Sequence, residues 1–379
     1  MKPQCILNLD FFDWVTYHYK ASHEIPTEAD FRKMIARFAD GGFDTINFRT
    51  SVCGKVCYPS KVMDVFTGDY RLDCNILARV MEKWNPLSVV VDACRKNNLT
   101  VWAWITLFDS YCIGLEDSFF SGRPDLLMRS RDGKNALRGV PCYASPETQQ
   151  YRLREAREVS ELGVDAIFYS MHSHTCCSRL DGDPEGENIF GYNPEIVEAF
   201  KERQGINILT DEFEPYDLYK LQGEFLTTYL SDVRDLLKPK GQGLYCTFAW
   251  DNDDGIHGTG PTVVHFGYSK GRSAVPYHRM VGIHLDCENW MRRGIANGLA
   301  AQTDHVDEIV KVKELAGGGD FYVWLFCGFD KNTAQKRVST LKRVTQEAQE
   351  AQLCGCILHE QMSLDMSPSL WDVIEPRKR

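Results

Sequence analysis

Residues 100–107 read Thr100-Val101-Trp102-Ala103-Trp104-Ile105-Thr106-Leu107, an apolar run with the β-branched and aromatic composition of a buried strand. The segment before it, Pro86–Lys96, has the apolar spacing of a helix and a proline at its first position. Runs of the same kind recur along the chain, each separated from the next by helical patterning. That alternation is typical of repeated βα units, in which the strands are parallel.

The alternation predicts eight strands, over Cys5–Asp10, Thr45–Arg49, Thr100–Leu107, Ala166–Met171, Gly243–Ala249, Gly298–Thr303, Phe321–Cys327 and Cys356–His359. Helices are expected over Glu28–Ala39, Pro86–Lys96, Ser145–Glu161, Gly223–Leu237, Cys287–Ile295, Val306–Ala316 and Asn332–Gln352. Capping residues support these assignments, as where Thr27 and Asp30 open the first helix. Eight parallel strands imply a closed (β/α)8 TIM barrel, an α/β fold, as a single domain over residues 1–379.

The chain has 379 residues, about 130 more than a typical barrel of about 250. The surplus falls in residues 50–84, 172–220 and 250–286, which predicts long insertions after strands two, four and five. Segments after barrel strands lie on the carboxyl-end face, where active sites are built. Pro194–Gln204, inside the second insertion, is itself helical in pattern. We expect the charged side chains of Ser145–Glu161, such as Arg152 and Glu155, to form a solvated outer face.

Composition excludes several classes of partner. The 53 acidic and 43 basic side chains give a net charge of −10, and no basic cluster is present that would bind nucleic acid or an anionic membrane. No apolar run is long enough to span a bilayer, and Met1–Asp10 lacks signal-peptide features. We therefore expect a cytoplasmic protein, or a periplasmic or secreted one if a leader peptide has been removed. The 14 cysteines contain no CxxC pair and are expected to be reduced and mostly buried.

Polar side chains at the predicted strand ends are the candidates for function. The catalytic candidates are Asp10, Asp109, His172, Asp251 and Glu360. The candidates for substrate binding are Trp14, Arg49, Tyr169, His174, Trp250 and Asp304. Carboxylates beside aromatic rings suit carbohydrate, because rings pack against the apolar faces of sugars while acids transfer protons.

Some of these residues have a structural alternative. Arg49 is expected either to pair with Asp10 or Asp109, or to bind a substrate carboxylate through its fork of N–H donors. Trp102 and Trp324 lie within strands and are expected in the barrel core. Asp165, at the start of strand four, suits a cap or turn. His172, His174 and Cys176 have close spacing but no fourth local ligand, so no metal site and no cofactor is assigned.

Several stretches resemble the family-10-like glycosyl hydrolases, a barrel group found widely in bacteria. The resemblance rests on Asn85-Pro86-Leu87 with Leu99–Trp104, on Tyr143–Glu147 with Val164–Ile167, on Gly191–Val197 with Phe200-Lys201, and on Gly223–Thr227. It covers roughly residues 80–300 and implies a barrel that acts on glycosides. The chain departs from the family pattern at Tyr169-Ser170, where members often carry Asp, and strand seven does not end in Glu.

The departure leaves two mechanisms open. In the first, an inverting pair comes from Asp10, Asp109, Asp251 or Glu360, with carboxyl groups about 6.5–9.5 Å apart. In the second, His172 works with Asp10 and Arg49 binds an acidic sugar, an arrangement that resembles the inverting sialidase barrels.

The sequence thus predicts a glycoside hydrolase that uses general acid/base catalysis on a carbohydrate substrate. Two alternatives remain: a carbohydrate-binding barrel without catalysis, and a metal-dependent barrel enzyme such as an isomerase or lyase. The sugar, the linkage and the oligomeric state are left open.

Overall fold

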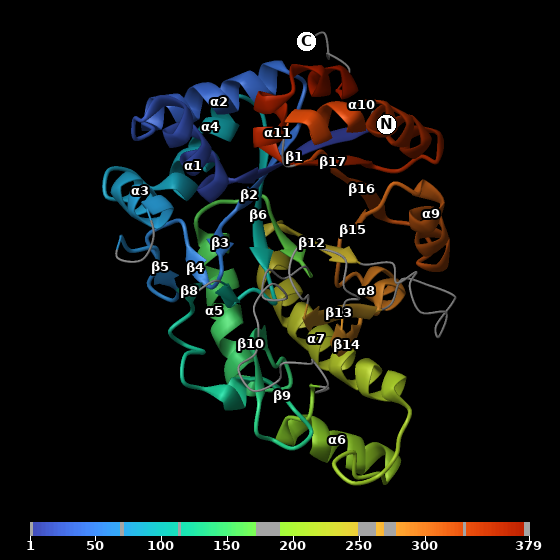
Figure 1. Cartoon of the computed structure of the whole chain (residues 1–379). Coiled ribbons are helices and arrows are strands. Elements are labelled where there is room, and N and C mark those ends of the chain that lie inside the picture. The colour runs from blue at the N-terminus through green and yellow to red at the C-terminus, as the bar shows by residue number, and fades with distance from the viewer. Residues whose placement is uncertain are drawn as a thin grey trace.

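The computed structural model describes residues 3–68, 72–112, 115–171, 190–248, 263–268, 278–328 and 331–374. Eight parallel strands close into a barrel in the order β1-β17-β16-β15-β12-β11-β6-β2 (Figure 1). The strands are β1 (Gln4–Asp10), β2 (Thr45–Arg49), β6 (Thr100–Thr106), β11 (Ala166–Ser170), β12 (Gly243–Phe248), β15 (Gly298–Gln302), β16 (Asp320–Phe326) and β17 (Gly355–His359). The (β/α)8 prediction is confirmed, and each strand lies within one residue of its predicted bounds.

Helices cover the outside of the barrel. Those that connect successive barrel strands are α2 (Glu28–Asp40), α4 (Pro86–Lys96), α5 (Pro146–Glu161), α7 (Pro215–Leu237), α8 (Cys287–Arg292), α9 (Val306–Leu315) and α10 (Lys331–Glu350). The start of α2 shows why such boundaries are readable: Thr27 and Asp30 form a reciprocal capping box. The helix α7 begins earlier than expected, because Glu214 caps it and Pro215 occupies its first turn.

Extra elements follow four of the barrel strands. After β2 come β3 (Ser51–Val52), β4 (Lys55–Val56), β5 (Asp64–Val65) and α3 (Leu72–Met81). After β6 come β7 (Tyr111–Cys112), β8 (Leu115–Glu116), the 3-10 helix η1 (Pro124–Leu126), β9 (Leu127–Arg129) and β10 (Ala136–Pro141). The segment after β11 contains α6 (Pro194–Gln204), and that after β12 contains β13 (Val263–Tyr268) and β14 (His278–His284). The elements after β6 were not predicted.

Short helices complete the chain. The first is α1 (Phe11–Ser22), which begins directly at the end of β1, and the last are α11 (Gln361–Met366) and the 3-10 helix η4 (Pro368–Val373). A further 3-10 turn, η3 (Lys238–Lys240), ends α7. In Figure 1 both termini lie at the top of the view, and the hairpin β9–β10 lies with α6 at the bottom. Because α1 begins at Phe11 and α11 begins at Gln361, each of these helices starts at the carboxyl end of a barrel strand, β1 and β17 respectively.

The core has two layers. Inward-facing side chains fill the barrel, and they are Ile6, Trp102, Trp104, Ala166, Phe168, Ala300, Tyr322, Trp324 and Ile357. A much larger cluster packs between the strands and the surrounding helices. The expectation that Trp102 and Trp324 belong to the core is confirmed, since they are 4% and 2% exposed. Burial of this apolar surface is the main stabilising contribution to the fold.

The charged face expected on α5 is partly wrong. Arg152 and Glu155 are buried under the helix and form an ion pair of 2.9 Å, and Arg152 also donates to the carbonyl of Thr106 at 3.0 Å. Glu158 accepts a hydrogen bond from the backbone N–H of Lys61 at 2.7 Å. These side chains tie α5 to β6 and to the segment after β2, because each faces the barrel rather than solvent.

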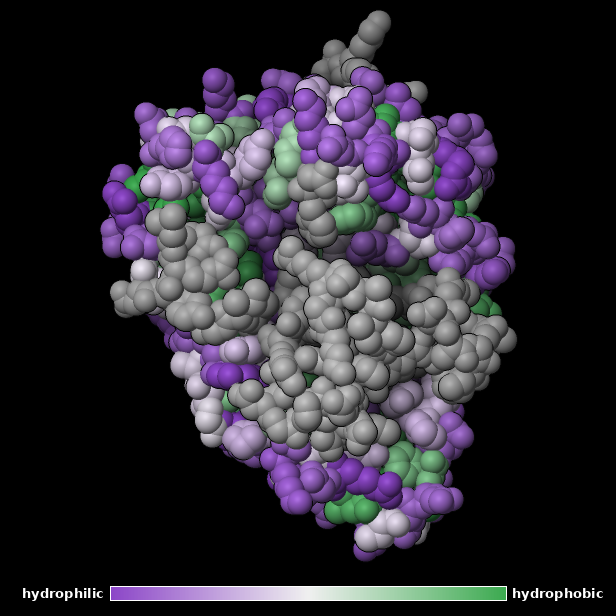
Figure 2. Space-filling view, viewed as in Figure 1, coloured by the Kyte–Doolittle hydropathy of each residue, from purple (hydrophilic) through white to green (hydrophobic). Residues whose placement is uncertain are grey.

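The surface of the described residues is largely hydrophilic, as the upper part of the space-filling view shows (Figure 2). Among the described residues, the large hydrophobic side chains that are exposed are Leu209 and Leu315. Within the part of the chain that the structure describes, no helix combines the length and the hydropathy needed to cross a membrane. The described cysteines, including Cys53, Cys57 and Cys246, are free thiols.

Candidate active site

Arg49 is held between two aspartates at the carboxyl ends of neighbouring strands. Its Nη1 lies 2.7 Å from Asp10 Oδ2 and its Nη2 lies 3.0 Å from Asp109 Oδ2. Its Nε donates to the carbonyl of Ser51 at 3.1 Å. Burial would lower the pKa of Arg49, but attraction by Asp10 and Asp109 raises it above its ordinary value. Arg49 was expected either to form an ion pair or to bind a substrate carboxylate. The structure shows the ion pair, which Arg49 forms with both Asp10 and Asp109.

Both the carboxylate and the backbone of Asp10 are hydrogen-bonded to neighbouring groups. Its Oδ1 caps α1 by accepting from the backbone N–H groups of Phe12 at 3.0 Å and Asp13 at 3.3 Å. Gln361 accepts from the backbone N–H of Asp10 at 3.0 Å and donates to its carbonyl at 3.2 Å. The register places Asp10 beside Arg49 and Arg49 beside Trp104. Asp10 therefore joins the first barrel strand to the last and holds Arg49 in place.

The carboxyl groups of Glu360 and Asp13 lie together beside that of Asp10. Oxygens of Asp10, Asp13 and Glu360 all lie within 4.8 Å of one another. Glu360 is 3% exposed, whereas Asp13 is half-buried. Burial first, then the charges of Asp13 and Asp10 and a hydrogen bond with Asp13, raise the pKa of Glu360 well above its ordinary value.

This arrangement suits a shared proton better than a metal ion. Three carboxylates at this spacing can hold a divalent cation. However, the guanidinium of Arg49 already neutralises Asp10, and a second cation beside it would be repelled. A proton shared among these carboxyl groups would relieve the repulsion between them without any such ion.

Below this layer the barrel carries a polar chain that points inward. Asn47 donates to Asn8 Oδ1 at 2.8 Å, and Asn8 Nδ2 lies 3.4 Å from Nδ1 of His359. The His359 ring meets Trp104 and Trp324 edge to face, with centroids 5.6 and 5.4 Å apart. The guanidinium of Arg49 lies 5.0 Å from the Trp104 ring centroid. The mouth of the barrel is thus a continuous polar and aromatic surface.

Two aromatic candidates lie in the core rather than at the mouth. Trp14 is 6% exposed and packs on Phe11 and Phe31, with ring centroids 5.6 and 5.0 Å away. Tyr169 is fully buried, and its hydroxyl lies 2.7 Å from that of Tyr229 on α7. Since β11 turns Phe168 into the barrel, Tyr169 faces the helices. Neither ring is placed to stack on a sugar.

Asp304 is bound by a helix. Both of its carboxylate oxygens accept from Arg337 of α10, at 2.7 and 2.6 Å. The hydrogen bond from Arg337 lowers the pKa of Asp304. Asp165 takes the turn role expected of it, since its carboxylate accepts from the N–H of Val101 at 2.7 Å. The remaining candidates, His172, His174, Trp250 and Asp251, lie outside the described residues.

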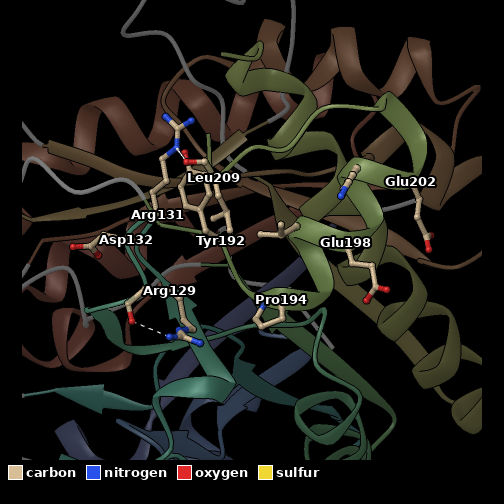
Figure 3. Close-up of a pocket in the computed structure, with 11 residues that line it drawn as sticks. Arg129, Arg131, Asp132, Tyr192, Pro194, Glu198, Glu202 and Leu209 are labelled. Atoms are coloured by element: carbon tan, nitrogen blue, oxygen red, sulfur yellow. Dashed lines mark hydrogen bonds between the residues drawn. The ribbon is translucent and has the colours of Figure 1, made fainter. Parts of the chain in front are cut away.

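A separate cavity of about 770 Å³ lies between the β9–β10 hairpin and α6 (Figure 3). Its wall includes Arg129, Arg131 and Tyr192. Arg129 donates to the carbonyl of Gly133 at 2.8 Å, and Arg131 donates to that of Leu209 at 3.2 Å. These arginines hold loops together, and the acidic Asp132, Glu198 and Glu202 balance their charge. This cavity is not the candidate active site.

Sequence reasoning did not single out Asp13. It lies three residues after Asp10, and that spacing within the first turn of α1 was the available signal. The helix was not recognised, because Phe11-Phe12 continues the apolar run of the strand. Glu360 was predicted as a catalytic candidate, and the structure brings it to the same end of the barrel as Asp10 and Asp109.

The fold can now be compared with known proteins. No protein family matches the chain, and no curated protein matches it by sequence. Among solved structures, the glycoside hydrolase domain of PgaB (BpsB) from Bordetella bronchiseptica superposes with a TM-score of 0.56 at 10% identity, over 98% of this chain and 99% of that one. This chain shares the (β/α)8 barrel fold of that domain.

Two further structures agree. The catalytic domain of β-amylase from Paenibacillus polymyxa gives a TM-score of 0.52 at 10% identity, over 97% of this chain and 94% of that one. The β-galactosidase from the psychrophilic Marinomonas ef1 gives 0.52 at 9% identity, over 94% of this chain and 54% of that one. At these identities the likeness shows the fold alone, and the resemblance to the family-10-like group stays a prediction.

Proposed function

We propose that this chain is a glycoside hydrolase and that Glu360 is its general acid. The observation that carries the proposal is the buried carboxyl of Glu360 at the end of β17, which lies beside the carboxyl groups of Asp10 and Asp13 and whose pKa is raised by burial and by their charges. Glycosidases need a carboxylic acid that keeps its proton near neutral pH. Barrels of the same fold that are described as glycoside hydrolase, β-amylase and β-galactosidase support this choice.

The proposed reaction begins with proton transfer. Glu360 gives its proton to the glycosidic oxygen while the bond from that oxygen to the anomeric carbon breaks, and Glu360 becomes a carboxylate. Arg49, whose charge acts against the rise in the pKa of Glu360, stabilises the carboxylate that forms. Asp13 sets the pKa and the orientation of Glu360. Water adds to the anomeric carbon and loses a proton to the second catalytic group, or to the Glu360 carboxylate where that group has attacked the sugar; a proton from solvent restores the acid in the first case.

Asp10 and Asp13 lie too close to Glu360 to be the base of an inverting pair. One oxygen of each lies within 4.8 Å of an oxygen of Glu360, whereas the carboxyl groups of inverting enzymes are about 6.5–9.5 Å apart. Asp10 is also already paired with Arg49. We assign them to positioning, together with Asp109. The group that activates water or attacks the sugar is expected from the sequence at His172 or Asp251.

The test is hydrolysis of a panel of natural and aryl glycosides by the wild-type chain and by Glu360→Gln. Asp165→Asn is the matched control, because it makes the same acid-to-amide change at the opposite end of the barrel. We expect turnover of at least one glycoside, lost with Glu360→Gln and kept with Asp165→Asn. Equal turnover by both variants would contradict the assignment of Glu360.

One observation favours a second candidate function, a carbohydrate-binding barrel without catalysis. The two strand-end aspartates, Asp10 and Asp109, are both ion-paired with Arg49 and have no reactive role of their own. This alternative predicts saturable sugar binding with no turnover on any glycoside of the panel. Any turnover that Glu360→Gln abolishes would dismiss it.

A further inference from the structure

Several buried polar atoms at the mouth of the barrel have no hydrogen-bond partner among the described residues. They are Trp104 Nε1, Thr106 Oγ1, Asn47 Oδ1 and Glu360 Oε1. All four side chains are at most 5% exposed, and they come from the adjacent strands β2 and β6 and from the end of β17. A buried donor or acceptor without a partner loses its hydrogen bonds to water and gains none in return, so native proteins leave few of them.

We propose that these atoms form a subsite for one uncharged sugar ring and that the N–H of Trp104 donates to one of its hydroxyls. The inference rests on the proposed function, since it names the class of substrate for the same site. Sugar hydroxyls both donate and accept, which matches a set that contains an N–H donor, a hydroxyl and carbonyl-type acceptors. The rings of Trp104 and Trp324, which fill the barrel below, make the floor of this end apolar.

The exposure of neighbouring side chains shows where a sugar enters. On β15, β16 and β17 the last inward-facing residues are Gln302, Phe326 and His359, and none of them is buried. On β6 and β12 the corresponding residues, Thr106 and Thr247, are buried. The Phe326 and His359 rings lie 6.2 Å apart. At this end of the barrel the side chains of β15–β17 are therefore more accessible than those of β6 and β12, so a sugar would first meet Phe326 and His359.

The charges of the described residues at the mouth disfavour an acidic sugar. Among those residues the arginine at the strand ends is Arg49, and it already pairs with Asp10 and Asp109. Asp13 and Glu360 add further carboxyl groups beside it. A uronic or sialic acid would bring another carboxylate next to these groups, which like-charge repulsion opposes. The sialidase-like reading of Arg49 is thus disfavoured, and an uncharged ring is preferred.

The experiment measures binding of sugar probes to the full chain by isothermal titration calorimetry. The uncharged probes are methyl β-glucoside, methyl β-galactoside and methyl β-N-acetylglucosaminide, and the acidic probe is methyl β-glucuronide. The test variants are Trp104→Phe, which removes the N–H and keeps a ring, and Thr106→Val, which removes the hydroxyl and keeps the shape. Trp290→Phe is the control, because its N–H is bound to Thr227 away from the mouth at 2.7 Å.

We expect at least one uncharged probe to bind more tightly than the glucuronide. Trp104→Phe should weaken that binding about fivefold to tenfold, the effect of one lost hydrogen bond, and Thr106→Val by a similar factor, while Trp290→Phe should leave it unchanged. Preference for the glucuronide, no binding of any uncharged probe, or unchanged affinity in both test variants would overturn the subsite.

The two proposals fail in different ways. Binding that depends on Trp104, without turnover of any glycoside, would overturn the proposed function and leave the subsite standing. Turnover that Glu360→Gln abolishes, with sugar affinity unchanged in Trp104→Phe and Thr106→Val, would overturn the subsite and leave the proposed function standing. Near-native melting of each variant shows that loss of fold is not the cause.

Discussion

Replacing Arg49 by methionine should destabilise the protein strongly. The side chains of Arg49, Asp10 and Asp109 are 5%, 3% and 1% exposed, so solvent cannot take the place of the guanidinium. Removing one partner of a buried ion pair costs about 3–5 kcal/mol, because it leaves an uncompensated buried charge. Here one substitution leaves two aspartates without their cation. The expected loss is therefore a large part of a total stability of about 5–15 kcal/mol.

The assay is equilibrium unfolding in urea, followed by tryptophan fluorescence and checked by circular dichroism. The control is Arg343→Met, because Arg343 pairs with Glu347 on the surface of α10 at 51% and 39% exposure. That variant should lose no more than about 0.5 kcal/mol. Arg49→Lys should fall between the two, since it keeps the charge but not the fork. A loss below about 1 kcal/mol in Arg49→Met would refute the reasoning from buried charge.

Three further predictions follow from the described contacts. The pKa of Glu360 is raised in the folded protein, so Glu360 contributes stability below about pH 4.5. This contribution is lost as the pH rises through the pKa of Glu360 in the folded state. Glu360→Gln should therefore flatten the change of the urea midpoint with pH. Burial raises the pKa of Asp117 to about 6, so the wild-type protein should lose stability as the pH rises from about 4 through about 6. Asp117→Asn should not show this loss. The same dependence of stability on pH in the variant and the wild type would contradict the prediction. Tyr169→Phe should lower the free energy of unfolding by about 1 kcal/mol, because it loses the hydrogen bond to Tyr229, and it should leave sugar binding intact. Weaker sugar binding by this variant would show that Tyr169 belongs to the binding site.

The barrel could be predicted because its signals are local. Runs such as Thr100–Thr106 are largely apolar and are separated from one another by capped helices, so each strand is readable from its own sequence. The elements after β6 escaped prediction because strands of two or three residues, such as β7 and β9, have no periodicity. The partly wrong outer face of α5 has a related cause, since Arg152 and Glu155 neutralise each other and can be buried together.

The candidate site was only partly predictable, because it depends on contacts between opposite ends of the chain. Glu360 could be placed at a strand end from sequence, but its pairing with Asp13 requires β17 to lie beside β1. Trp14 was misplaced because the start of α1 at Phe11 was not recognised, and a helix there turns the indole toward α2. Arg49 was expected either to pair with Asp10 or Asp109 or to bind a substrate carboxylate, and only the barrel register brings it to both aspartates.

The dependence of the rate on the leaving group tests the role of Glu360 most directly. For a sugar that the panel identifies, the turnover of its methyl glycoside and of its dinitrophenyl glycoside is compared between wild type and Glu360→Gln. A methyl glycoside needs a proton on the departing oxygen, whereas dinitrophenolate leaves without one. The account predicts that Glu360→Gln loses about a hundredfold to ten-thousandfold in rate on the methyl glycoside and little on the dinitrophenyl glycoside. Equal losses on both substrates would contradict the assignment of Glu360 as the proton donor.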